Sequence, residues 1–377
     1  MRVHVVGSGG RELTLRSVLA RTAEIVDDVD RADLVVIGPE APLSAGLADD
    51  LRAAGKVVFG PGRDGARLES SKAWMKEVLS GAGIPTARHR SFAPGEEAAA
   101  AAFLASLDGG YVVKTDYLAA GKGVLVTDSL DDAVADARAK LAHGSVVIEE
   151  RMTGPELSLL CVCDGRRAVP LPPARDHKRV GTGDTGPMTG GMGAYSPVDG
   201  VDGEAIAKTI VQPTLDALRE RGVDYRGCLY AGLMLTPEGP KIVEYNVRFG
   251  DPEAQVVLPR FAGDLAAFLH EAARGDLRTE PATSEDAYVC VVMAAEGYPG
   301  TPRTGDRVEG IAAAEAVDGV QVLPVAVTPD GRTGGGRVLN VVARGSTVGA
   351  ARAAAYEAVA RISWPGAHFR TDIAEGA

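Results

Sequence analysis

The sequence predicts a mixed α/β protein, of the α+β kind, in which short strands and helices alternate along 377 residues. Three stretches lead to this prediction. Residues 3–20 have the pattern of a strand, a glycine turn and an amphipathic helix, residues 112–126 that of two β-branched strands around a glycine loop, and residues 228–245 that of two longer strands. A chain of this length is sufficient for two or three domains with substantial cores.

The composition favours an acidic protein that binds small molecules. Lys and Arg number 40 against 51 Asp and Glu, and the net charge of −11 argues against nucleic-acid and membrane partners while allowing a local cationic pocket for a small phosphorylated substrate. The four cysteines lack zinc or thioredoxin spacing and are expected to be reduced thiols. Since the chain starts without a leader pattern and has no apolar run of about 18 residues, we expect a cytoplasmic protein.

The first 70 residues are predicted to form a shortened Rossmann-like domain. A strand at 3–6, a turn at 7–10 and a helix at 11–20 precede strands at 34–37 and 57–59, with a helix at 44–54 after the connection 38–43. The dinucleotide fingerprint requires glycine at the sixth position of the turn, where this chain has Glu12, so NAD binding is disfavoured.

Residues 71–275 are predicted to form the central domain, with a lid subdomain at about 84–152. Ser71 is placed to cap a helix at 72–79, and further helices after Pro94 and at 130–141 accompany the hairpin of residues 112–126. Residues 284–377 read as a separate C-terminal domain with a helix at 348–362, and we expect it to cover and support the site.

The hairpin of residues 112–126 has the composition of a phosphate-binding loop. Gly121 and Gly123 allow the backbone to approach an anion and to turn its N–H groups toward it, while Lys114 and Lys122 add two ammonium groups. The alternative is a surface hairpin with solvated lysines, and the loop alone does not decide between the two.

A second candidate site is the glycine-rich segment 175–195, predicted as one long loop. It gathers five charged or titratable residues beside its glycines, and long loops inside compact domains tend to be functional. These residues are Asp176, His177, Lys178, Arg179 and Asp184. A mobile linker is the alternative, although linkers are more often serine-rich.

The strand predicted at residues 241–245 ends in a polar face. Side chains alternate along a strand, so Glu244, Asn246 and, if the strand continues, Arg248 point to the same side. A carboxylate beside an amide oxygen suits Mg²⁺, and a guanidinium can hold a phosphoryl or carboxylate group with two hydrogen bonds. A solvated edge strand is the alternative.

Four segments resemble the signature sequences of the glycinamide ribonucleotide synthetase family, ATP-grasp ligases of purine biosynthesis: residues 114–124, 176–179, 183–197 and 243–253. The resemblance runs almost from end to end and includes residues 38–43, 297–300 and 364–370. It implies an ATP-grasp fold, small-molecule substrates, ATP with Mg²⁺ (or Mn²⁺) between two subdomains, and a monomer or homodimer. In that family, the carboxylate of glycine takes the γ-phosphoryl group of ATP, and the amine of 5-phosphoribosylamine then displaces phosphate to form an amide.

The resemblance also implies roles for individual residues. The implied ATP-binding residues are Lys114, Leu118, Gly121, Lys122, Gly123, Glu149, Glu150, Met152 and Glu156. The implied substrate-binding residues are Gly9, Gly10, Glu40, Asp176, Lys178, Arg179, Asp184, Thr185, Gly186, Pro187, Met188 and Asp251. Glu244 and Asn246 are the implied metal ligands, and the implied catalytic residues are Arg248, Lys122 and Asp184.

Three positions depart from the family pattern: Leu13 replaces a histidine, Tyr117 a glycine and Met188 an asparagine. The stretch between the first turn and the strand at 34–37 is also shorter than is usual in the family. A positive φ at Tyr117 would cost about 1 kcal/mol, and Met188 removes an amide from the presumed substrate loop. Two alternatives therefore stay open: a paralogue that couples a different amine, and a nucleotide-binding protein without catalysis.

Overall fold

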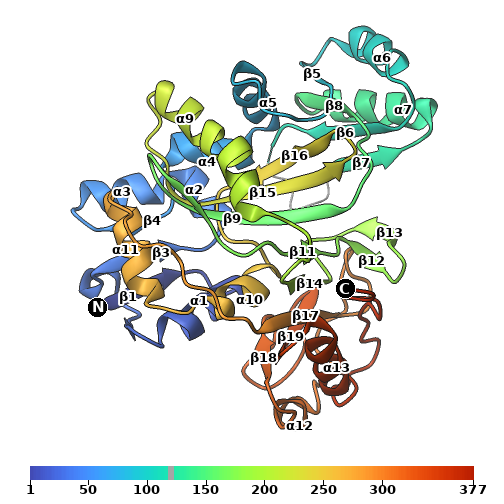
Figure 1. Ribbon diagram of the computed structural model, residues 1–377. Coiled ribbons are helices and arrows are strands. Elements are labelled where there is room, and N and C mark those ends of the chain that lie inside the picture. The colour runs from blue at the N-terminus through green and yellow to red at the C-terminus, as the bar shows by residue number, and fades with distance from the viewer. Residues whose placement is uncertain (118–122) are drawn as a thin grey trace.

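The computed structural model describes residues 1–117 and 123–377 and confirms a mixed α/β fold (Figure 1). The N-terminal part contains a parallel sheet with the strand order β2-β1-β3-β4. Its strands are β1 (Arg2–Val6), β2 (Glu24–Ile25), β3 (Leu34–Ile37) and β4 (Val58–Phe59), and its helices are α1 (Gly10–Leu19), α2 (Glu40–Ala45), α3 (Leu47–Ala53) and a short 3₁₀ turn, Val29–Arg31. All four residues of β3 are buried, as expected for a parallel strand covered on both faces.

The Rossmann-like opening is confirmed, but the second helical segment is longer than the sequence predicted. Helix α2 begins at Glu40, inside the stretch predicted as a connection, and Gly46 separates α2 from α3. Gly46 has a φ of +96°, a left-handed conformation that ends one helix and starts the next.

The second sheet, in the predicted lid region, is antiparallel and has the order β5-β8-β6-β7. It consists of β5 (His89–Phe92), β6 (Tyr111–Thr115), β7 (Val124–Thr127) and β8 (Val146–Glu150), with α6 (Glu97–Ala105) and α7 (Leu130–Leu141) beside it at the upper right of Figure 1. Lys114 pairs with Val124, so the predicted hairpin is confirmed. A separate apolar core lies between this sheet and its helices.

The central sheet is antiparallel, with the order β10-β9-β15-β16. Its strands are β9 (Glu156–Asp164), β10 (Ala168–Pro170), β15 (Arg226–Thr236) and β16 (Gly239–Asn246). Alternate residues of β9 enter two different cores: Leu159 and Cys161 pack in one, Leu160 and Val162 in the other. The remaining helices of this part are α4 (Arg63–Ser70), α5 (Lys72–Gly81), α8 (Gly203–Ile206), α9 (Gln212–Glu220), α10 (Ala254–Val257) and α11 (Leu265–Arg274), with a 3₁₀ turn at Leu258–Arg260.

Two local irregularities shape the central sheet. In the pairing of β15 with β16, Gly232 faces Glu244 and Leu233 faces Ile242, so Val243 is an extra, bulged residue. Helices α8 and α9 are separated by a π-helical segment, Ala207–Val211, directly before α9. Pro213 at the start of α9 lacks the N–H that a regular α-helix would use there.

The remaining sheets correct one prediction, because the segment 175–195 is not one irregular loop. Its strands β11 (Arg175–Asp176) and β14 (Gly193–Ser196) join β17 (Ala287–Ala294), β19 (Arg337–Gly345) and β18 (Val320–Pro324) in one sheet. Between them, β12 (Arg179–Gly181) and β13 (Thr185–Met188) form a separate hairpin, near which the C-terminus lies in Figure 1. Helices α12 (Ile311–Glu315) and α13 (Val348–Val359) contact this sheet. The domain boundaries at about 70 and 284 stay predictions.

Within residues 1–117 and 123–377, no helix has both the length and the apolar character needed to cross a membrane.

Candidate active site

Three buried residues from three elements form a cluster that we call the lysine cluster: Lys76 of α5, Lys114 of β6 and Glu149 of β8. Lys114 Nζ lies 2.8 Å from Glu149 Oε1, and Lys76 Nζ lies 3.0 Å from Glu149 Oε2. The three residues are at most 4% exposed. Two ammonium groups thus share one carboxylate, which leaves an excess of positive charge.

The lysine cluster connects the lid sheet to the central sheet. Lys114 Nζ donates to the carbonyl of Val243 at 3.1 Å, which is the bulged residue of β16. Lys76 Nζ donates to Thr86 Oγ1 at 2.6 Å, and this hydroxyl donates to the carbonyl of Ile242 at 2.6 Å. The structure therefore brings Lys114 of the hairpin to the end of the polar strand.

Burial and charge act in opposite directions within the lysine cluster. Burial alone would raise the pKa of Glu149, but the two ammonium groups together lower it. Burial also lowers the pKa of Lys76 to about 8, although Glu149 partly offsets this effect. A single carboxylate does not compensate fully for the burial of two lysines.

A second group, which we call the carboxylate cluster, has the opposite imbalance. Lys178 Nζ lies 3.5 Å from Glu156 Oε2, 3.7 Å from Asp176 Oδ2 and 3.8 Å from Glu244 Oε1. The three carboxylates come from β9, β11 and β16, so three strands bring them to one ammonium group. Glu244 directly follows Val243, and the two clusters therefore meet on consecutive residues of β16.

The pKa values of the carboxylate cluster reflect crowding of like charges. Burial, together with the nearby Glu253 and Glu244, raises the pKa of Asp176 to about 6, even though Lys178 opposes the shift. For Glu156, Lys178 lowers the pKa, but burial and the neighbouring carboxylates outweigh it and the net shift is upward. A bound cation would relieve this repulsion.

A buried hydrogen-bonded chain lies behind the carboxylate cluster. The hydroxyls of Ser158 and Tyr230 are 2.9 Å apart, and Tyr230 donates to Glu253 Oε1 at 2.6 Å. Ser158 Oγ also lies 3.4 Å from Asp176 Oδ1. The chain of hydroxyls and carboxylates holds Asp176 in place from inside the protein.

The predicted metal ligands fit a divalent cation. Burial raises the pKa of Glu244, but Lys178, Lys114 and Lys72 outweigh burial and the net shift is downward, which keeps the carboxylate ionised. Among the described residues, no group of three His, Cys, Asp or Glu side chains is arranged to hold a metal. Glu244 and Asn246 would therefore supply two oxygen ligands, and a hard cation such as Mg²⁺ would take the others from phosphate and water.

Strand β16 ends at Asn246, so it does not continue to Arg248 as the prediction required, but the guanidinium of Arg248 still contacts the Asn246 side chain. Its Nη2 donates to Asn246 Oδ1 at 3.2 Å and to Glu69 Oε1 at 2.8 Å, and its Nε donates to Glu40 Oε2 at 3.2 Å. Burial lowers the pKa of Arg248, but Glu69 and Glu40 outweigh it and the guanidinium stays charged. Two carboxylates thus fix its orientation.

The N-terminal glycine turn lies beside Asp251. The N–H of Gly9 donates to Glu12 Oε2 at 2.7 Å, and the N–H of Arg11 donates to Asp251 Oδ2 at 3.4 Å. A Cβ atom at Gly10 would lie 2.5 Å from Asn340 Nδ2, so a larger residue there would have to displace the Asn340 side chain. The structure therefore brings together Gly9, Gly10 and Asp251, three of the predicted substrate residues.

The remaining predicted substrate residues lie on the β12–β13 hairpin. Asp184, at its turn, is exposed and has a φ of 53°, and its carboxylate accepts a hydrogen bond from Arg370 Nη1 at 2.6 Å. Arg179 Nη1 donates to the carbonyl of Gly186 at 2.7 Å, and Met188 pairs with Arg179 across the hairpin. The other two predicted residues, Thr185 and Pro187, lie on β13.

Three predicted ATP-binding residues, Leu118, Gly121 and Lys122, lie outside the described residues. The carbonyl of Gly123 accepts a hydrogen bond from the N–H of Thr115 at 2.9 Å. Glu150 ends β8 and its carboxylate accepts from the N–H of Arg88 at 2.9 Å. Met152 follows in the segment between β8 and β9.

The structure also places the three departures from the family pattern. Leu13 packs against an apolar core on α1, and Met188 is part of β13. Asp184 and Ala374 are the described non-glycine residues with a positive φ, so Tyr117 has no left-handed strain. The strain energy that a positive φ at Tyr117 would cause is therefore absent.

Sequence reasoning missed the residues that support the site from a distance. They are Arg11, Glu69, Lys76, Tyr230, Glu253 and Arg337. Arg337 Nη1 donates to the carbonyls of Gly190 (2.9 Å) and Asp251 (2.7 Å) and thus joins two loops of the site. Glu253 could have been predicted from the sequence, because it follows Asp251 in the same polar segment. Lys76 and Glu69 carry no such signal, because they resemble ordinary residues of a helix surface.

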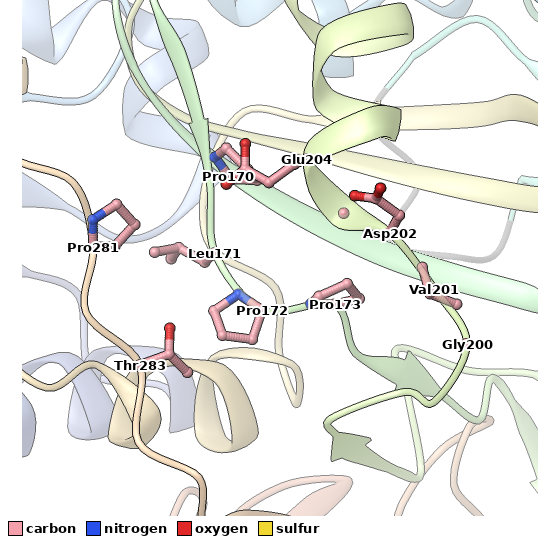
Figure 2. Close-up of a pocket in the computed structure, with 11 residues that line it drawn as sticks. Pro170, Leu171, Pro172, Pro173, Gly200, Val201, Asp202, Glu204, Pro281 and Thr283 are labelled. Atoms are coloured by element: carbon pink, nitrogen blue, oxygen red, sulfur yellow. The ribbon is translucent and has the colours of Figure 1, made fainter.

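A separate open pocket of about 600 Å³ lies away from these clusters (Figure 2). Much of its wall is formed by four prolines, Pro170, Pro172, Pro173 and Pro281. Asp202 and Glu204 project from the start of α8. Its described lining contains no lysine or arginine, so it does not have the charge of a phosphate site.

Comparison with known families matches the chain in three consecutive parts. The N domain of phosphoribosylglycinamide synthetase matches residues 23–69, its ATP-grasp domain residues 70–254, and its C domain residues 288–376. The chain is 46% identical to the phosphoribosylamine–glycine ligase of Streptomyces coelicolor, with 99% of each covered. It is 44% identical to that of Mesorhizobium japonicum, covering 99% of this chain and 97% of the relative.

Solved structures give the same result. The phosphoribosylamine–glycine ligase of Thermotoga maritima superposes with a TM-score of 0.83 at 32% identity, covering 99% of this chain and 100% of the other. The biotin carboxylase domain of Hydrogenobacter thermophilus 2-oxoglutarate carboxylase has a TM-score of 0.70 at 14% identity, covering 98% and 91% of the two chains, and shares the fold.

Proposed function

Because the chain belongs to the phosphoribosylglycinamide synthetase family, we propose that its two charged clusters bind the phosphates and the divalent metal of ATP. The chain is an ATP-dependent ligase that joins glycine to 5-phosphoribosylamine by a carbon–nitrogen bond and releases ADP and phosphate. The full-length similarity to ligases of this one activity favours this function over a paralogue with another amine and over a nucleotide-binding protein without catalysis.

The single observation that supports the proposed site is the meeting of two oppositely unbalanced clusters on β16. Lys114 contacts the carbonyl of Val243, and Glu244 contacts Lys178. The first cluster has excess positive charge and the second has excess negative charge, so an anion and a cation are needed side by side. A nucleotide phosphate chain with its metal ion has this arrangement of charge.

Lys114 would bind the phosphates, and Glu244 with Asn246 would hold the metal, for which we propose Mg²⁺, with Mn²⁺ as the alternative. When bound, the metal neutralises charge on the phosphate oxygens during transfer. Arg248, held by Glu40 and Glu69, would stabilise charge on the transferred phosphoryl group. Phosphoryl transfer depends mainly on positioning and charge neutralisation, and the contacts of Lys114 and Arg248 fix these two side chains in advance.

The substrate residues around Asp251 would hold the acid and the amine. Gly9, Gly10 and Asp251 lie together, and Arg337 fixes the loop of Asp251 through its backbone and its carboxylate. Lid closure would exclude water and protect the acyl phosphate from hydrolysis. We propose the roles of Asp184, Thr185 and Gly186 in substrate binding on their position in the β12–β13 hairpin.

A coupled assay of ADP release tests this function directly. With ATP, a divalent metal, glycine and freshly prepared 5-phosphoribosylamine, we expect ADP release that depends on both substrates and a product containing the new amide. ADP release only with another amine, or ATP binding without turnover, would contradict the proposal. The cytoplasmic location and the choice between monomer and homodimer stay predictions.

A further inference from the structure

Lys76 belongs to the lysine cluster, yet its own contacts are already made within the protein. Its Nζ contacts Glu149 Oε2 at 3.0 Å and Thr86 Oγ1 at 2.6 Å, and the residue is 1% exposed. A side chain that is enclosed in this way has no obvious need for a positive charge of its own. Burial of a neutral residue of similar size would normally cost less free energy than burial of a charged lysine.

The two oxygens of the Glu149 carboxylate face different lysines, and this arrangement suggests a role for the positive charge of Lys76. Oε1 faces Lys114 and Oε2 faces Lys76, so each lysine has one oxygen. If Lys76 were neutral, the full negative charge of Glu149 would act on Lys114 alone. Because a charge pair in a buried site is only weakly screened, this would cancel most of the attraction of Lys114 for an anion.

We propose that Lys76 is a positioning residue that competes for Glu149 and thereby preserves the positive charge of Lys114 for a nucleotide phosphate. The inference rests on the proposed function and assigns a role to a lysine that does not touch the nucleotide. Thr86 supports this role, because it fixes Lys76 Nζ to the carbonyl of Ile242 on β16. Lys114 is fixed one residue further along, at the carbonyl of Val243.

The proposal makes a specific statement about net charge. The wild-type cluster has two cations and one anion, Lys76→Met leaves one of each, and Glu149→Gln leaves two cations. The double variant Lys76→Met/Glu149→Gln returns the cluster to the same net charge as the wild type. Affinity for a phosphate-bearing ligand should follow this net charge rather than the number of ion pairs.

The experiment measures the Kd of ADP with Mg²⁺ by calorimetry at pH 7 for the wild type and these variants, with unfolding midpoints alongside. We expect Lys76→Met to weaken binding about tenfold, which corresponds to about 1.4 kcal/mol, and the double variant to bind more tightly than Lys76→Met. The matched control is Lys56→Met, whose lysine pairs with Asp30 in the N-terminal part and should leave the Kd unchanged. In turnover, Lys76→Met should raise the KM for ATP about tenfold and leave kcat within about twofold.

The outcomes separate the inference from the function on which it rests. A wild type that does not bind ADP would contradict both. Normal ADP binding by Lys76→Met, or a double variant that binds more weakly than Lys76→Met, would overturn the positioning role and leave the proposed function standing. If Lys76→Met does not fold, Lys76→Gln keeps a donor for Glu149 without the charge and should show the same tenfold loss.

Discussion

The lysine cluster and the carboxylate cluster are built from the same kinds of side chain but in inverse proportions. One places two lysines around Glu149, and the other places three carboxylates around Lys178. Neither is a balanced ion-pair network, which is what a purely structural cluster would favour. The difference supports the proposal that each region binds a ligand of the opposite charge and that the two ligands lie next to each other.

The largest expected effect comes from removing the carboxylate that joins the two regions. Glu244→Ala should lower turnover by about 10²–10³-fold, because charge that develops during phosphoryl transfer would lose its fixed metal site. The assay is the initial rate of ADP release with all substrates saturating, and the unfolding midpoint confirms that the variant is folded. Activity within tenfold of wild type would show that Glu244 is not a metal ligand.

Removing Lys178, the cation of the carboxylate cluster, tests the excess of negative charge in that cluster. Lys178→Met should reduce the free energy of unfolding by about 3 kcal/mol, because it leaves the buried Asp176 carboxylate and the partly exposed Glu156 and Glu244 without their cation. Urea denaturation measures the loss, and added Mg²⁺ should recover part of it. The control is Arg303→Met, whose guanidinium is half-exposed and pairs with Asp306, and which should cost about 1 kcal/mol or less.

Ligand addition tests whether the two regions act together. At about 100 times its Kd, ADP with Mg²⁺ should stabilise the fold by about 2.7 kcal/mol. ADP with a chelator, or Mg²⁺ alone, should each give much less, because one cluster would remain unbalanced. Thermal unfolding under the three conditions measures this, and equal shifts with and without the metal would contradict the coupling of the clusters.

The smallest effect concerns the segment that carries Asp176 and Lys178. Burial, with a further contribution from Arg370, lowers the pKa of the intervening His177 to about 4. The unfolded chain therefore binds a proton on this histidine between about pH 6.5 and 4 while the folded state does not, so His177 removes about 3 kcal/mol of stability as the pH falls through that window.

The variant His177→Gln isolates this contribution. Asp176 has a raised pKa of about 6 and acts in the opposite direction, because its folded state binds the proton more tightly. The relevant quantity is therefore the difference between wild type and variant in urea denaturation at pH 7 and at pH 4.5. A difference that does not change with pH would show that His177 is already exposed to protonation.

Much of the site was accessible from the sequence because its chemistry is local. The glycines and Lys114 of the hairpin, and the neighbouring polar residues Glu244 and Asn246, follow from spacing along single strands. The hydrogen bond from Lys114 to the Val243 carbonyl joins two different sheets, and nothing in the local pattern specifies it or the bulge at Val243. The segment 175–195 was read as a loop, because strands of two to four residues rich in glycine have little β-propensity of their own.

The sequence by itself determined the fold class, the family and the groups that can hold phosphate and metal, because these depend on short motifs and on hydrophobic periodicity. Only the tertiary structure decided which charges meet. Lys76 Nζ lies 3.0 Å from Glu149 Oε2, and Arg248 Nη2 lies 2.8 Å from Glu69 Oε1, although the two residues of each pair are distant along the chain. Such pairs form when separate elements pack around a common core, and their energies depend on burial and on neighbours from several strands, which no local pattern records.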